Sequence, residues 1–236
     1  MPNNYTIISL GGSLVAPKTG FDISFLKKFR KLILDEVGPS SAKASEGKRF
    51  ILIVGGGATA RAYQEGLRGT LGRVTDEQLD WLGVHATVLN AQFVRALFGA
   101  HAHDEVQMNP TKKIKTSAPI IVGSGWKPGW SSDYDAALAA KTYGTREVIN
   151  ISNIDYVYDK DPTKFRNAKP IGELSWPAYR AMVGDTWYPG SNAPFDPIAA
   201  REAAKNRLTV KILNGRDLKS VRAAIRDAAF RGTTIA

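Results

Sequence analysis

Hydrophobic residues along this chain gather in short runs, and longer stretches with helical patterning separate the runs. The runs at 5–10, 50–54, 118–122, 147–152 and 208–213 have the length and continuity of buried strands. Between them, apolar residues recur every three or four positions, as expected of helices with one buried face. This alternation predicts an α/β fold, a three-layer αβα sandwich around a mainly parallel central sheet.

Several helix starts carry a recognisable signal. Thr75 and Gln78 have the spacing of a capping box, and an acidic residue or a serine precedes the other helices. The expected starts are Asp22, Thr75, Ser175 with Pro177 behind it, Asp196 with Pro197 behind it, and Asp217. The polar segments 38–48 and 153–169 are expected to be loops, and 232–235 a closing edge strand.

The chemistry is expected in the stretch from 123 to 140, GSGWKPGWSSDYDAALAA. It follows the apolar run at 118–122 and leads into an Ala-rich helix that opens at Ser131, Ser132 and Asp133. A strand that ends in a glycine-rich turn before a helix leaves backbone N–H groups at the positive end of the helix dipole, which suits phosphate. A carboxylate at Asp133 is then functional, or else Ser132 or Asp133 is only the helix N-cap. The stretch alone leaves both interpretations open.

Composition limits the class of protein and its partners. The 236 residues include no cysteine and carry a formal net charge of +10, which indicates an anionic partner or a solvated basic surface. Phosphorylated small molecules fit better than nucleic acid, because no basic strip is interleaved with aromatic residues. The start has no basic segment followed by a long apolar one, so we expect a cytoplasmic protein without a membrane segment.

Two common phosphate-binding motifs are absent. The chain contains neither a GxxxxGK[ST] loop nor a GxGxxG fingerprint, which argues against a P-loop enzyme and a dinucleotide-binding dehydrogenase. Short glycine turns at 11–12, 55–57 and 123 follow expected strands instead. Since the carboxyl ends of parallel strands meet at one edge of a sheet, these turns are expected to converge on one ligand site.

Six motifs, in order along nearly the whole chain, resemble the amino acid kinase superfamily and, within it, the archaeal type of uridylate kinase. They are SLGGSL (9–14), VGGGATARAY (54–63), DWLGVHATVLNA (80–91), GWKPGWSSDYDAALAA (125–140), NIDYVYDKDP (153–162) and FDPIAA (195–200). The resemblance implies an amino acid kinase-like fold and transfer of the ATP γ-phosphate to UMP with Mg²⁺, in a homohexamer. It also implies a single domain over 1–236, with the acceptor bound by roughly 1–140 and ATP by roughly 141–236.

The resemblance also assigns site residues. The positions matching ATP contacts are Gly12, Ser13, Gly57 and Arg61 for the phosphates, with Ser152, Asn153, Tyr158 and Asp161 for adenosine. Those matching the UMP site are Gly56, Asp80, Trp126, Lys127, Pro128, Gly129, Trp130, Ser131 and Ser132, where Asp80 faces the ribose hydroxyls. Asp133 matches the acidic residue near the transferred phosphoryl group. No side chain is assigned as a metal ligand, since Mg²⁺ is expected to enter with ATP.

One departure from the family affects the chemistry. Many relatives have a lysine on the first strand where this chain has Ser9, so we expect another cation, Lys160 or Lys127, near the transferred group. The expected catalytic residues are therefore Asp133, Arg61 and Lys160. Two alternatives remain open: a sister kinase acting on another small molecule such as isopentenyl phosphate, and a non-catalytic nucleotide-binding or storage protein of the same fold.

Overall fold

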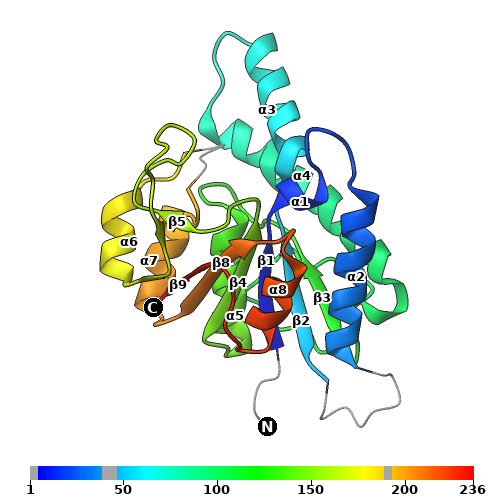
Figure 1. Ribbon diagram of the computed structural model, residues 1–236. Helices are drawn as coiled ribbons and strands as arrows, with labels where there is room; N and C mark the ends of the chain where they lie inside the picture. Colours follow the sequence, from blue (N-terminus) through cyan, green and yellow to red (C-terminus); the bar gives the residue numbers. More distant parts are fainter. Residues whose placement is uncertain (1–4, 39–46, 189–192) are drawn as a thin grey trace.

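The computed structural model describes residues 5–38, 47–188 and 193–236, so most of the expected loop at 38–48 lies outside the described residues. Its central sheet has seven strands in the order β3-β2-β1-β4-β8-β9-β7 (Figure 1). Their bounds are β1 Tyr5–Leu10, β2 Arg49–Val54, β3 Ile120–Gly123, β4 Glu147–Ser152, β7 Glu173–Leu174, β8 Thr209–Asn214 and β9 Thr233–Ile235. The first five in that order are parallel, as the sequence predicts, and β9 runs antiparallel to β8.

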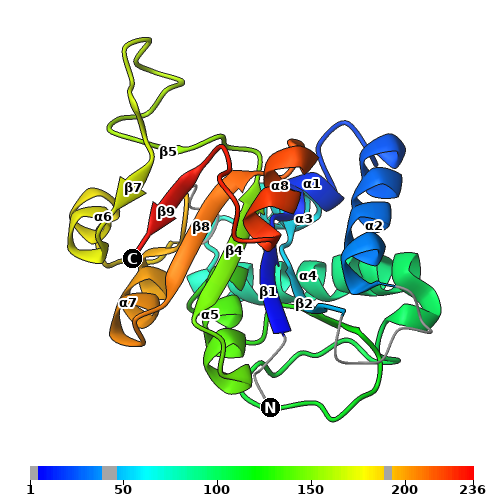
Figure 2. The ribbon, with the colours of Figure 1, turned by 60° about the horizontal axis from the view of Figure 1, so that its bottom comes forward.

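Helices cover both faces of the sheet, which confirms the predicted αβα sandwich. Alternate strand residues enter opposite cores, so that Ile8 packs in one and Ile7 in the other. Helices α2 (Ile23–Val37), α4 (Asp76–Phe98) and α8 (Leu218–Ile225) close the first core. Helices α5 (Ser132–Tyr143), α6 (Trp176–Val183) and α7 (Pro197–Lys205) close the second (Figure 2).

The carboxyl ends of the parallel strands point to one end of the molecule. There the short helix α1 (Gly12–Val15) follows β1 directly, and α3 (Gly57–Thr70) begins three residues after β2. In Figure 1, α3 stands above these strand ends. This edge of the sheet is where the sequence places the glycine turns.

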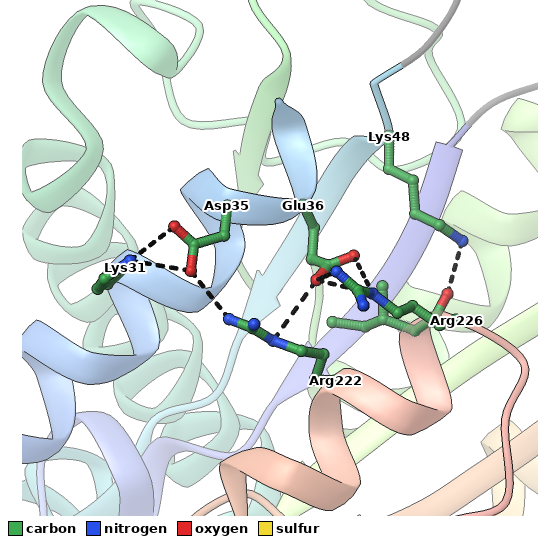
Figure 3. A network of polar contacts seen from close by, with 7 residues as sticks. Lys31, Asp35, Glu36, Lys48, Arg222 and Arg226 are labelled. Carbon is green, nitrogen blue, oxygen red and sulfur yellow. Dashed lines mark hydrogen bonds and ion pairs between the residues drawn. The ribbon is translucent and has the colours of Figure 1, made fainter. Parts of the chain in front are cut away.

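A network of polar contacts joins α2 to α8 (Figure 3). Glu36, which is buried, pairs with Arg226 at 2.9 Å and with Arg222 at 3.5 Å. Asp35 bridges Lys31 and Arg222, both at 2.9 Å. The charges lie on the helices rather than at the strand ends, so this network stabilises the packing of the two helices and leaves the cleft free.

The capping predictions are confirmed. Thr75 and Gln78 form a reciprocal capping box, and the side chains of Asp22, Ser175, Asp196 and Asp217 accept from backbone N–H groups of the helices that they precede. At α5 the cap is Ser131, whose Oγ accepts from the N–H of Asp133 at 3.1 Å. The interpretation of Ser132 or Asp133 as the N-cap is therefore wrong, because Ser131 is the N-cap residue of α5.

The prediction of a closing edge strand is also wrong. Strand β9 lies between β8 and β7, and the edge is the two-residue β7. The expected loop at 153–169 contains a further short strand, β5 (Val157–Tyr158), which pairs with β6 (Pro170–Ile171). Strands of two residues are too short to produce a hydrophobic pattern. No helix in the described part of the chain is both long and apolar enough to span a membrane.

Candidate active site

A cleft of about 1300 Å³ opens at the carboxyl ends of the parallel strands. Most of the residues that the sequence assigns to the site line it, although they come from six separate segments. They are Gly12, Ser13, Gly56, Gly57, Arg61, Asp80, Lys127, Trp130, Ser131, Ser132, Asp133, Ser152, Asn153, Tyr158, Lys160 and Asp161. Trp126, Pro128 and Gly129 lie in the same loop as Lys127 but do not line the cleft.

The turns after β1 and β2 meet backbone to backbone in the cleft. A Cβ built on Gly12 would lie 2.1 Å from the nitrogen of Gly57, and one built on Gly57 would lie 2.2 Å from the carbonyl oxygen of Gly12. Gly57 also has a φ of +60°, which glycine adopts without strain. The first N–H groups of α1 and α3 therefore start side by side, and such groups have no partner within their own helices.

Asn90 of α4 fixes the turn after β2 through hydrogen bonds. Its side-chain amide donates to the carbonyl oxygens of Gly55 and Gly56, both at 2.9 Å. These hydrogen bonds fix the two carbonyl groups of the turn, and the N–H of Gly55 donates to the carbonyl oxygen of Leu10 at 2.9 Å. Within the described residues, the N–H groups of Gly56 and Gly57 are the ones left for a ligand. The sequence analysis did not identify Asn90, because an asparagine on a long helix gives no sign of its distant partners.

Asp133, in the first turn of α5, is surrounded by hydrogen-bond donors rather than by a cation. Its Oδ1 accepts from Ser9 Oγ at 2.8 Å and from Asn150 Nδ2 at 3.3 Å, and its Oδ2 accepts from the N–H of Asp196 at 3.2 Å. Loss of contact with water and the nearby charge of Asp196 raise the pKa of Asp133 to about 6. Ser9 thus occupies the place on β1 from which a lysine would reach this carboxyl group.

Buried carboxyl groups accept hydrogen bonds from the loop 125–131. Asp80 accepts from the N–H of Gly129 and Asp196 from the N–H of Ser131, both at 2.7 Å. Asp135 accepts from the indole Nε1 of Trp130 at 3.1 Å. The backbone N–H groups of Gly129 and Ser131 therefore donate within the protein and not to phosphate, contrary to the expectation for this turn.

Asp80 is engaged twice before any ligand arrives. Besides Gly129, the indole Nε1 of Trp187 lies 3.4 Å from both carboxylate oxygens. Burial raises the pKa of Asp80 above its ordinary value, and the hydrogen bond from Gly129 opposes that shift. Trp187 lines the cleft from the segment after α6, and the sequence analysis does not assign it to the site.

The loop after β4 is fixed by charge and amide contacts. Asp155 accepts from Asn214 Nδ2 at 2.9 Å and pairs with Arg231 at 2.7 Å. This anchoring leaves Asn153 and Tyr158 on the wall of the cleft. Asp161, at the rim, instead closes a local turn in which the N–H and Oγ1 of Thr163 donate to its Oδ1.

Five basic residues line the cleft: Lys18, Arg61, Lys127, Lys160 and Arg216. Lys127 lies over the ring of Trp126, with 4.1 Å between Nζ and the ring centroid, and Lys160 lies over Phe165 at 5.5 Å. Arg216 pairs with Asp22 at 2.5 Å. Lys18 and Arg216 were missed, because a single basic residue in a loop resembles ordinary surface charge. Five aspartates line the cleft as well: Asp80, Asp133, Asp135, Asp159 and Asp161. Burial raises the pKa of Asp133 and of Asp135, which reduces their negative charge near neutral pH, so the basic side chains can offset the charge of phosphate groups.

The buried carboxyl groups should make stability depend on pH. Burial raises the pKa of Asp135 to about 8, so the folded protein retains a proton that the unfolded chain releases near pH 4. We expect Asp135→Asn to match the wild type in free energy of unfolding at pH 4. Above pH 4 the variant should have the larger free energy of unfolding. The difference from the wild type should grow to a few kcal/mol by pH 8 and then level off. Urea titrations from pH 4 to pH 9 measure this, and a constant difference across that range would contradict it.

Comparisons with known proteins agree with this geometry. The profile of the Amino acid kinase family matches residues 4–214. A protein named uridylate kinase from Thermoplasma volcanium is 31% identical over 222 residues, covering 93% of this chain and 92% of that protein. Another uridylate kinase, from Hyperthermus butylicus, is 29% identical over 95% of both chains. The crystal structure of uridylate kinase from Archaeoglobus fulgidus superposes with a TM-score of 0.79 at 25% identity and covers 98% of this chain and 99% of that one. This chain belongs to the amino acid kinase family.

Proposed function

We propose that this protein transfers the γ-phosphoryl group of ATP to UMP and so forms UDP. The observation that carries the proposal is the contact between Gly12 and Gly57, which joins two halves of one cleft that five basic side chains line. Relatives of similar length that share about 30% of its sequence are named uridylate kinases. Most of the residues assigned to ATP and to UMP line this one cleft, and an in-line transfer between two nucleotides requires a shared cleft of this kind.

In this proposal the two nucleotides enter from opposite ends. Ser152, Asn153, Tyr158 and Asp161 surround the adenosine, and Asp80 with the loop 125–132 surrounds the uridylate. The boundary between the two parts of the single domain then falls near residue 140. The phosphates meet at the N–H groups that begin α1, α3 and α5, where helix dipoles favour negative charge.

Phosphoryl transfer needs alignment and charge neutralisation more than covalent help. Arg61, one turn into α3, and Lys160, on the wall of the cleft, would supply positive charge to the transferred group. The acceptor oxygen of UMP is already anionic near neutral pH and needs no general base. Asp133 would orient the donors around it and the ions that accompany the phosphates.

The side chains present fit magnesium that arrives with ATP. Within the described ranges, no three His, Cys, Asp or Glu side chains are grouped to hold a metal ion. Magnesium bound to nucleotides commonly takes its ligands from phosphates, water and one or two carboxylates. Asp133 is the carboxylate in position to contribute, and the ion would neutralise charge on the phosphate oxygens.

Replacement of Asp133 tests the catalytic half of the proposal. We expect Asp133→Asn to lower kcat for UMP by about 10²-fold, the size found when one preorganised electrostatic group is removed, and to change either KM by less than about threefold. A coupled assay of ADP release measures both constants. Asp35→Asn, on the outer surface of α2, is the matched control and should behave as wild type.

The same assay with CMP, isopentenyl phosphate and acetylglutamate distinguishes the acceptors. UMP should be turned over with the highest kcat/KM. Turnover of none of the four, with ATP still bound, would identify a binding protein and refute the proposal. Unchanged kcat in Asp133→Asn would remove that residue from the mechanism.

Asp80 tests the acceptor half. We expect Asp80→Ala to raise the KM for UMP by about tenfold, because it removes an acceptor for the ribose hydroxyls and releases the N–H of Gly129. The KM for ATP should stay within about twofold. Asp76→Asn, on the exposed side of α4 one turn earlier, provides the control. Equal rises in both KM values would show that Asp80 supports the whole cleft rather than the acceptor.

We also propose the homohexamer that the resemblance implies. Light scattering at micromolar concentration should then give six times the chain mass of 25.7 kDa. A monomer under the conditions of the activity assay would contradict it.

A further inference from the structure

Asp135 is a carboxyl group in a place where the fold calls for an apolar residue. It lies in the first turn of α5 with 1% of its surface exposed, and the next residues of the helix, Ala136 and Ala137, are fully buried in the second core. Burial of an ionisable group costs free energy unless hydrogen bonds compensate. A buried carboxyl group that is retained despite this cost indicates a specific role, and its hydrogen-bond partners identify that role.

The donor to Asp135 comes from the loop that borders the acceptor half of the cleft. The indole Nε1 of Trp130 donates to its Oδ1 at 3.1 Å. The backbone N–H of Trp126, earlier in the loop, opposes the rise in the pKa of this carboxyl group. Asp80 of α4 accepts from the N–H of Gly129, so carboxyl groups hold the loop at two successive residues.

The indole that Asp135 holds is part of the cleft wall. Trp130 lines the cleft, and its ring packs against Tyr134 with 4.8 Å between centroids and against Trp126 with 6.4 Å. Without the hydrogen bond to Asp135, ring packing alone would have to fix the indole, and the glycine that precedes Trp130 allows the loop to pivot. A flat aromatic surface at this place suits a planar base.

We propose that Asp135 is a positioning residue for the acceptor: it fixes the indole of Trp130 as the wall against which the base of the acceptor nucleotide packs. This inference rests on the proposed function for the identity of the acceptor. Asp135 itself borders the cleft, and in this proposal it acts through Trp130 rather than by contact with phosphate or metal. Its effect is therefore on acceptor binding rather than on the transfer step.

The test compares two replacements. Asp135→Val keeps the size and removes the hydrogen bond to the indole, whereas Asp135→Asn keeps an oxygen that accepts from the indole. We expect the valine variant to raise the KM for UMP between fivefold and twentyfold, with the KM for ATP within twofold. The asparagine variant should restore the KM for UMP to within about threefold of wild type. A valine variant that is unchanged, or that raises both KM values equally, would overturn the proposal, and so would an asparagine variant that matches valine.

Trp130→Phe provides a second test, because phenylalanine retains an aromatic ring and lacks the indole N–H that donates to Asp135. If Asp135 acts through the indole, Asp135→Val should add little to the KM for UMP in a Trp130→Phe background, and additive effects would contradict the proposal. Trp176→Phe is the matched control. Trp176 also donates its indole N–H, to the carbonyl oxygen of Leu208 at 2.8 Å, but it is the first residue of α6 and does not line the cleft. Its loss should leave the KM for UMP unchanged.

A readout without substrate separates this inference from the proposed function. Tryptophan fluorescence should change in Asp135→Val and much less in Asp135→Asn, and most of the change should disappear in the Trp130→Phe background. Absence of that pattern would overturn the positioning role even in an active enzyme. A wild-type protein that does not phosphorylate UMP would refute the function, and the fluorescence would still decide whether Asp135 positions Trp130.

Discussion

The close approach of Gly12 and Gly57 is the constraint on which the site depends. The turns after two neighbouring parallel strands touch through backbone atoms, and any side chain at either position would collide with the other turn. Only this contact brings the starts of α1 and α3 close enough to serve one phosphate chain. The sheet order that makes β1 and β2 neighbours, with β4 on the other side of β1, then determines which loops border the cleft.

Around this contact, carboxyl groups accept hydrogen bonds from the loop that borders the cleft, while basic side chains line the cleft. Asp80, Asp135 and Asp196 each take a donor from the loop 125–131, and they do so at the cost of burying carboxyl groups. The N–H groups that donate to these carboxyl groups cannot donate to the ligand, but their hydrogen bonds fix the shape of the loop. Preorganisation of this kind favours catalysis, because the groups need not rearrange as charge moves in the transition state.

The sequence predicted the layers of the fold because periodicity and capping are local signals. The capping box at Thr75 and the continuous apolar run of β2 need only neighbouring residues to be recognised. It also predicted that the glycine turns converge, because parallel strands end at the same edge. The two-residue β7, which makes β9 an interior strand, leaves no such signal.

The hydrogen bonds that shape the site could not be predicted from the sequence. Asp80 and its partner Gly129 lie 49 positions apart, and Ser131 and its partner Asp196 lie 65 apart. Nothing in an Ala-rich helix indicates that Asp135 faces inward, and Trp187 belongs to a turn-rich segment without periodicity. Such contacts depend on how elements pack, and packing is decided by the whole chain.

A crystal structure with a bisubstrate analogue, adenosine and uridine joined through a polyphosphate chain, tests the central claim most directly. The account predicts that the phosphates cross the contact between Gly12 and Gly57 beside Asp133, with adenine near Tyr158 and uracil near Trp130. Phosphates bound away from that contact, or the two bases in exchanged positions, would contradict it.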